Sequence, residues 1–438
     1  MTAEIAILNR NAVALAADSA VTLQLPEGHK IYQGNKLFCL SKYHPVGVMV
    51  YGSADFMEVP WETIVKDYRR RLGQQRFPRI SDYANDFLDY LENNVEFFPP
   101  ERQEVSCQEV VSAWLRRLTQ RLQRRVEEVL ARQGSISDAA VQALFRQIVD
   151  EDIRRLRRSR IIDRYRRSRP GTLRMRYRAA IRAAITRELQ QLEEVVPRAR
   201  LEAGCVLAIM RDVYWNRESG IVIAGFGARQ VRPSLRGYKL DTIIGRTLRV
   251  VEDRAADITP QMNASVHAFA QSEMVALFMN GVDSDLESFV VSSMNRILVE
   301  GYPSLIGQLL QTLLPSARRQ RLLRRISDAG RRAVSEFYSG LKDYSREEHW
   351  EPIIDIVTHL PKEELAAMAE ALVNLTLFKR HVTKQAETVG GPIDVAIISR
   401  GDGFIWIKRK HYFEPNLNPH FFSKYYYDTE QRTIARGR

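Results

Sequence analysis

Thr2, Asp18 and Lys36 are the residues of this 438-residue chain whose types and spacing suit nucleophilic catalysis. We expect Met1 to be removed, because methionine aminopeptidases act when the next side chain is small. The new first residue would then carry a hydroxyl group and a free α-amine. Such a threonine is a nucleophile that supplies its own general base. An aspartate and a lysine nearby would tune the pKa of that amine through their charges.

The segment that leads to Asp18 predicts a β-hairpin. Two apolar strands, at residues 3–8 and 12–17, flank a turn triplet at residues 9–11. If the turn centres on the middle residue of this triplet, facing residues have numbers that sum to about twenty. Asp18 is then expected opposite Thr2.

Lys36 stands at the entrance of a third predicted strand segment. Residues 37–50 form two apolar runs that a turn at residues 41–45 separates, and Gly52 allows a tight bend where the segment closes. If this segment lies beside the hairpin, the Lys36 side chain reaches Asp18. The alternative for Lys36 is a solvated lysine on an edge strand.

Parts of the chain resemble a proteasome β-type subunit, which is an N-terminal nucleophile hydrolase. The matching parts, in the order that the family has, are Thr2, NAVALAADSAVT (11–22), QGNKLFCL (33–40), GSAD (52–55), SGIVIAGFG (219–227) and GGPIDVAIISRGDG (390–403). The resemblance covers residues 1 to about 60, 216–300 and 386–412. It implies an α+β fold, a four-layer αββα sandwich of antiparallel sheets, here with large helical insertions.

The same resemblance implies the roles of the site residues. Thr2 would be the nucleophile, with Asp18 and Lys36 as its charge partners. A backbone N–H near Gly52 would stabilise the oxyanion, and Ser272 falls where the family places a serine close to the threonine amine. The implied activity is that of a proteasome-like threonine protease, which hydrolyses peptide (amide) bonds.

Two departures from the family pattern keep a second interpretation open. A shift of one residue would align Tyr51 instead of Gly52 with the oxyanion position. Before the glycine that matches Gly390, the family carries an aspartate and a serine, whereas this chain has Ala386 and Val389. The alternative is a catalytically inactive, proteasome-like scaffold that binds a partner through its helical insertions.

The basic surplus of the chain, a formal net charge of +12, lies mostly in a helical region before residue 215. Its periodicity predicts helices that Gly134 and Pro170 interrupt, with Ser137 and Asp138 as candidate caps of the helix that follows Gly134. Arginine mixed with glutamate on long helices indicates a solvated face with i,i+4 ion pairs. Nucleic-acid binding through these arginines is a third reading, although the region lacks a platform of aromatic side chains for base stacking.

We therefore divide the chain into four regions. They are residues 1–60, the first part of the N-terminal nucleophile hydrolase core; 61–215, an arginine-rich helical insertion that replaces or extends the first helical layer; 216–412, the remainder of the core, with extended helices at 265–384; and 413–438, a basic aromatic tail. Within the extended helical region, we expect one helix to end at Gly281 and another to end at Gly301.

Composition limits the remaining possibilities. Cys39, Cys107 and Cys205 are odd in number and lack CxxC spacing, so the sequence indicates neither a disulfide framework nor a zinc site. We expect no cofactor and no metal. No apolar run approaches the roughly 18 residues that span a bilayer, and we expect a cytoplasmic protein. The family resemblance implies a protein or peptide substrate, a homo-oligomer and an ATPase unfoldase as a partner.

Overall fold

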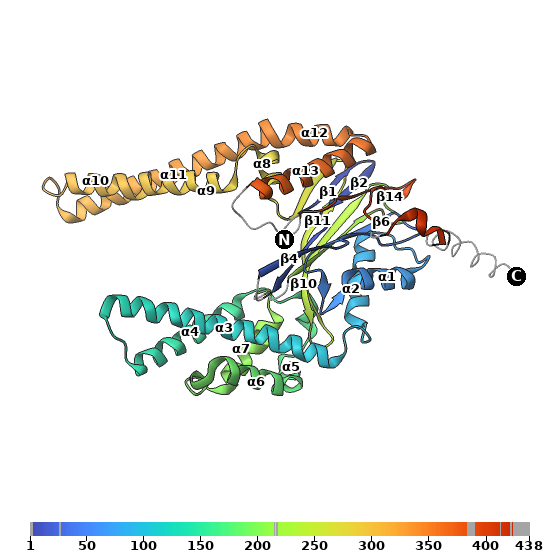
Figure 1. Cartoon of the computed structure of the whole chain (residues 1–438). Coiled ribbons are helices and arrows are strands. Elements are labelled where there is room, and N and C mark those ends of the chain that lie inside the picture. Colours follow the sequence, from blue (N-terminus) through green and yellow to red (C-terminus); the bar gives the residue numbers. More distant parts are fainter. Residues whose placement is uncertain are drawn as a thin grey trace.

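The computed structural model describes residues 3–25, 28–213, 215, 218–382, 390–411, 413–420 and 423 (Figure 1). The chain has the expected α+β character, with two five-stranded antiparallel sheets and numerous helices. The boundaries of the four regions stay predictions. None of the described helices is long and apolar enough to cross a membrane.

The predicted hairpin is present as β1 (Ala3–Asn9) and β2 (Ala12–Ala17). The Asn9 side chain shapes its turn, because Asn9 Oδ1 accepts hydrogen bonds from the N–H groups of Asn11 (2.9 Å) and Ala12 (3.1 Å). Asparagine favours such turns because its side chain can bond the backbone just ahead of it.

This turn sets a register that differs from the prediction by one residue. Glu4 faces Ala17 across the hairpin, so the turn centres between two residues and not on a single one. The N–H of Asp18 accordingly donates to the carbonyl oxygen of Ala3 at 3.1 Å. The expectation that Asp18 lies opposite Thr2 is therefore wrong, since the residue that faces Asp18 is Ala3.

The hairpin lies in the middle of the first sheet, whose strand order is β12-β1-β2-β13-β14. The other strands of this sheet are β12 (Ala264–Ala270), β13 (Asp394–Ser399) and β14 (Gly403–Lys408). The helical region that we expected from residue 265 therefore begins later. The segment ASVHAFA alternates between small and larger side chains, and its pairing with β1 along the full strand makes it a strand.

The second sheet has the strand order β11-β10-β9-β6-β5. Its strands are β5 (Leu37–Cys39), β6 (Val46–Gly52), β9 (Ser219–Gly225), β10 (Ser234–Ile243) and β11 (Leu248–Asp257). The two-stranded ribbons are β3 (Ala20–Leu25) with β4 (Gly28–Gln33), and β7 (Asp55–Phe56) with β8 (Val59–Pro60). Strands β5 and β6 are those predicted on either side of the turn at residues 41–45.

One buried cluster joins the two sheets. Alternate residues of β1, such as Ala6 and Leu8, pack with Met49 of β6 and Val222 of β9. Because successive side chains of a strand point to opposite faces, the remaining residues of these strands face outward, where helices cover them.

Helices cover the outer face of each sheet. Against the second sheet pack α1 (Trp61–Leu72) and α2 (Ile80–Asn93), and against the first pack α8 (Glu273–Asn280), α12 (Glu351–His359) and α13 (Lys362–Val382). Gly281 ends α8 in a left-handed conformation, as expected of a glycine stop.

The arginine-rich region forms helices with a core of their own. They are α3 (Pro100–Gln133), α4 (Asp138–Arg158), α5 (Pro170–Arg176), α6 (Arg178–Leu189) and α7 (Arg198–Met210). Gly134 ends α3 and Ser137 caps α4, as expected. The helix that we expected to run on to Pro170 is shorter, since α4 ends at Arg158 and Pro170 begins α5, a position that suits proline.

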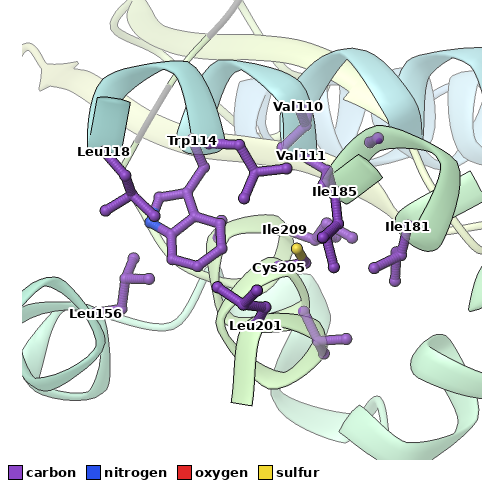
Figure 2. Close-up of a cluster of buried hydrophobic side chains, with 14 of the residues drawn as sticks. Val110, Val111, Trp114, Leu118, Leu156, Ile181, Ile185, Leu201, Cys205 and Ile209 are labelled. Carbon is purple, nitrogen blue, oxygen red and sulfur yellow. The ribbon is translucent and has the colours of Figure 1, made fainter. Parts of the chain in front are cut away.

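Trp114 of α3 lies at the centre of this core, surrounded by Leu118, Leu156 and Leu201 (Figure 2). Its indole N–H donates to Asp152 of α4 at 2.7 Å. The helices α3 to α7 are therefore held by shared apolar packing and by a buried polar contact.

A second helical region projects from the first sheet as a long arm (Figure 1). It consists of α9 (Ser284–Asn295), α10 (Tyr302–Leu309) and α11 (Ser316–Ser345). Gly301 does not stop the helix, contrary to the prediction. It keeps helical backbone angles, and a π-helical turn (Arg296–Gly301) passes directly into α10.

Candidate functional site

Asp18 and Lys36 form a buried ion pair. Lys36 Nζ lies 2.6 Å from Asp18 Oδ1, and the side chains are 5% and 0% exposed. Lys36 immediately precedes β5, and its carbonyl oxygen accepts a hydrogen bond from the N–H of Val50 at 2.9 Å. The contact that the sequence predicted is therefore present, and the solvated edge-strand alternative for Lys36 does not apply.

The backbone fixes the Asp18 carboxylate from several sides. Oδ1 also accepts a hydrogen bond from the N–H of Ala3 (3.0 Å), and Oδ2 accepts from the N–H groups of Ala20 (3.3 Å) and Gly390 (3.2 Å). Hydrogen bonds to an ionised acceptor are stronger than neutral ones. Asp18 therefore holds together the start of β1, the start of β3 and the approach to β13.

The backbone nitrogen of Ala3 bears directly on the predicted nucleophile, because it forms the peptide bond to Thr2. One oxygen of Asp18 accepts hydrogen bonds from this nitrogen and from Lys36. Thr2 itself lies outside the described residues, as do Ala386 and Val389. The roles assigned to these positions stay predictions.

Gly52 ends β6. It lies two residues after Val50, whose backbone N–H donates a hydrogen bond to the carbonyl oxygen of Lys36. Its backbone has a positive φ of 84°, and a Cβ atom there would lie 2.4 Å from the carbonyl oxygen of Glu218. Only glycine fits this position without strain. Gly52 therefore lies only two residues along β6 from the backbone hydrogen bond with Lys36. The oxyanion role of Gly52 stays a prediction.

Ser272 lies just after β12, beyond Ala270, which faces Ala3 across the sheet. It precedes the first residue of α8, and its exposed side chain makes no capping hydrogen bond. The backbone therefore places Ser272 near the start of β1. Its catalytic role stays a prediction.

Glu4 is a buried acid in the same region that the sequence reasoning missed. Its side chain is 0% exposed, and neither carboxyl oxygen has a hydrogen-bond partner among the described residues. Burial raises the pKa of Glu4 well above its ordinary value. The positive charge of Lys36 lowers this pKa, and the negative charge of Asp18 raises it further, but burial has the largest effect. The signal was available, because strand alternation places Glu4 on the same face as Ala6 and Leu8, toward the other sheet.

Burial also affects Lys36. Removal from water lowers the pKa of this ammonium group, while the negative charges of Asp18 and Glu4 raise it. Lys36 thus depends chiefly on Asp18, its hydrogen-bonded partner, to stay charged.

A second ion pair adjoins the first and was also missed. Lys410 Nζ lies 2.9 Å from Asp394 Oδ2 and 2.6 Å from Ser19 Oγ, and Ser19 in turn donates to the carbonyl of Pro392. Ser19 follows Asp18 directly, so the two pairs share one short segment of backbone. The polar side chain of Ser19 beside the predicted site aspartate was a signal for Ser19 alone, and not for Lys410 or Asp394.

The described residues contain no group of three or more His, Cys, Asp or Glu side chains placed to hold a metal ion. What the arrangement provides is a buried positive charge, anchored by a fixed carboxylate, at the start of β1. Such a charge can lower the pKa of a nearby amine and stabilise negative charge that develops beside it.

Comparison with known proteins adds little to this description. No protein-family model matches the chain, and no curated protein matches it. One solved structure that is similar to the chain is an Anbu mutant from Hyphomicrobium sp. strain MC1, at 8% sequence identity over 99% of this chain and 97% of that chain, with a TM-score of 0.27. A TM-score this low carries no argument about function.

Proposed function

We propose that this chain is an N-terminal threonine hydrolase that cleaves amide bonds through Thr2, once whatever precedes Thr2 has been removed. One observation supports the proposal above all. The oxygen of Asp18 that pairs with Lys36 also accepts a hydrogen bond from the nitrogen to which Thr2 is bonded. The packing of helices on the outer faces of two facing sheets is consistent with the proposed four-layer αββα sandwich.

The proposed mechanism begins with the α-amine of Thr2, whose ordinary pKa is about 7.7 to 8.0. The positive charge of Lys36 disfavours protonation of this amine, so that it acts as a general base near neutral pH. The amine accepts the proton of the Thr2 hydroxyl while the oxygen attacks the amide carbonyl. Asp18 holds Lys36 in place and balances its charge.

The attack produces a tetrahedral oxyanion, which a backbone N–H near Gly52 stabilises. Loss of one such donor lowers rates by about 10²- to 10³-fold in other enzymes. The Thr2 ammonium then returns its proton to the departing amine, leaving an ester on Thr2. A water molecule activated by the same amine hydrolyses this ester and restores the threonine.

Hydrolysis of an activated peptide amide tests the proposal. Thr2→Ala should abolish cleavage while the protein stays folded, and Lys36→Met should strongly reduce it. Lys66→Met is the matched control, because Lys66 pairs with Glu62 on the surface of α1. Cleavage by Thr2→Ala at the parental rate would overturn the assignment.

The alternative, an inactive scaffold, has its own supporting observation. The arm formed by α9 to α11 exposes large apolar side chains such as Phe289, Leu309 and Tyr344. An exposed apolar surface of this kind commonly marks a binding site. A folded protein that binds a partner through this arm and shows no hydrolysis would favour the scaffold.

The third reading, nucleic-acid binding through the helices α3 to α7, has less support. Several arginines of this region are already paired with acids of the same region or of α2. They include Arg121 with Glu151 and Asp152, Arg164 with Asp89 and Glu92, and Arg182 with Glu202. We retain a protein or peptide substrate, self-association and an ATPase partner as expectations.

A further inference from the structure

The end of the long arm combines positive charge with exposed apolar side chains. We call residues 301–327 the arm tip; it contains no aspartate or glutamate, although acids flank it at Glu300 and Asp328. Its five arginines are Arg318, Arg319, Arg321, Arg324 and Arg325. None of these forms an ion pair with an acid in the part of the chain that the structure describes.

The arginines gather at one end of the arm. Helices α10 and α11 lie side by side, since a Cβ atom on Gly307 would contact Leu323 at 3.0 Å. At 1.5 Å per helical residue, the last of the arginines, Arg325, lies within about 15 Å of Pro315, where the turn between the helices ends. The five arginines thus lie near the end of the arm at which α10 passes into α11, the far end of the arm in Figure 1.

Apolar side chains are exposed at the same end. Leu309 is 74% exposed, Leu313 is 71% exposed, and Tyr302 and Leu305 are each more than half exposed. Leu313 lies in the turn itself, beyond the end of α10. Leucines placed at the outermost turn of a hairpin are available for insertion into an apolar phase.

The helical pair α3 and α4 provides a contrast within the same molecule. Around its turn at Gly134, Glu127, Glu128 and Asp138 are interspersed with Arg124 and Arg132. That end is therefore mixed in charge, and the charge of the arm tip is not a general property of the helical regions.

We propose that the arm tip docks on an anionic lipid surface, with its leucines inserted at the boundary of the acyl chains and its arginines beside the headgroups. A basic segment with exposed leucines is the composition that interfacial membrane binding requires. A second copy of the arm tip would bring the two sets of arginines together, which like-charge repulsion disfavours. Nucleic acid would neutralise the arginines but leave the leucines exposed, because leucine does not stack on bases.

Flotation of the full chain with lipid vesicles tests this proposal. We expect binding to vesicles of phosphatidylcholine mixed with about a third of phosphatidylserine, weak binding to phosphatidylcholine alone, and a loss of binding as the ionic strength rises from about 0.1 M to about 0.5 M. Arg318→Gln with Arg321→Gln should weaken binding by about fivefold for each arginine. Leu309→Ser with Leu313→Ser should weaken it by at least about tenfold.

The matched control is Arg124→Gln with Arg132→Gln, which removes the same charge from the C-terminal part of α3 and should leave vesicle binding unchanged. Circular dichroism of each variant checks that it is folded. Equal partition of the parent chain into neutral and anionic vesicles would overturn the proposal. Vesicle binding by the arm tip variants equal to that of the parent would also overturn it. The same holds if the chain does not bind vesicles but self-associates in a way that requires Leu309 and Leu313.

Discussion

At the scale of single residues, the acids Glu4 and Asp18 lie in one buried region with the ammonium group of Lys36. Burying all three in ionised form would leave an uncompensated negative charge, which is strongly unfavourable in a protein interior. A protonated Glu4 resolves the imbalance, because Asp18 and Lys36 then neutralise each other. The raised pKa of Glu4 agrees with this arrangement.

This charge balance predicts a pH-dependent effect of Glu4→Gln on stability. The folded chain keeps the Glu4 proton to a higher pH than the unfolded chain does, whose glutamates titrate near pH 4.3. The free energy of unfolding is therefore unaffected by ionisation of Glu4 below that pH. It falls by about 1.4 kcal/mol per pH unit as the pH rises toward the pKa of Glu4 in the folded chain. Glutamine carries no such loss, so the variant should gain stability over the parent between pH 5 and pH 8.

Urea unfolding of parent and variant at both pH values measures this gain. Glu336→Gln, at an exposed position on α11, is the matched control. If the difference in unfolding free energy between the Glu4→Gln variant and the parent is the same at pH 5 and pH 8, Glu4 is not held in its protonated form.

The sequence allowed part of this site to be predicted. Asp18 and Lys36 could be brought together because the hairpin and the strand after Lys36 have clear apolar patterns. The register was wrong by one residue because it depends on the hydrogen bonds of the Asn9 side chain, which a turn signal alone does not resolve. Lys410 and Asp394 could not be linked to Asp18, because only the folded sheet brings together residues so distant in sequence.

At the scale of elements, the contact between α3 and α7 depends on the absence of a side chain. A Cβ atom on Gly204 of α7 would lie 2.3 Å from the ring of Trp114. Because that ring is fully buried and donates a hydrogen bond to Asp152, it cannot move aside without loss of other contacts. Glycine is a poor helix former, so its presence inside α7 reflects this packing.

Gly204→Ala should therefore destabilise the protein by about 1 to 3 kcal/mol, as overpacking of a core does. Gly340→Ala is the matched control, because Gly340 lies inside α11 with no atom within 4 Å of the added Cβ. That control should gain about 0.5 to 1 kcal/mol from improved helix propensity. Urea unfolding measures both, and a gain in stability for Gly204→Ala would contradict the packing argument.

The prediction of elements succeeded where local signals were strong. Gly134 and Ser137 mark the end of α3 and the start of α4 because a left-handed glycine and a serine cap act locally. The strand β12 and the continuous passage through Gly301 were missed. Both depend on tertiary partners, since β12 forms along β1 and the helix around Gly301 packs on α11.

At the scale of the whole molecule, the two helical regions differ in how they are held. Helix α3 buries residues along its first two thirds, including Cys107, Trp114 and Leu122. The buried residues of α11, a helix of similar length, are Val334 and Ser345. Both regions extend from the sheets in Figure 1, yet among the described residues only the region of α3 has a large core of its own.

Hydrogen exchange should reveal this difference. Amides in the middle of α11 should exchange at least about tenfold faster than those in the middle of α3, because helices with few buried contacts open locally at lower free energy. Mass spectrometry of peptides from the two helices, taken from the same exchange experiment, provides the comparison. Equal protection of both helices would mean that the arm is covered in solution.

The most direct test of the central claim is mass spectrometry of the chain after incubation with a peptide epoxyketone, a reagent that forms a ring with the amine and hydroxyl of an N-terminal threonine. The account predicts a single adduct on Thr2, in a chain whose first residue is Thr2, and no adduct in the Thr2→Ala variant. A purified chain that retains a residue before Thr2 and acquires no adduct would contradict it.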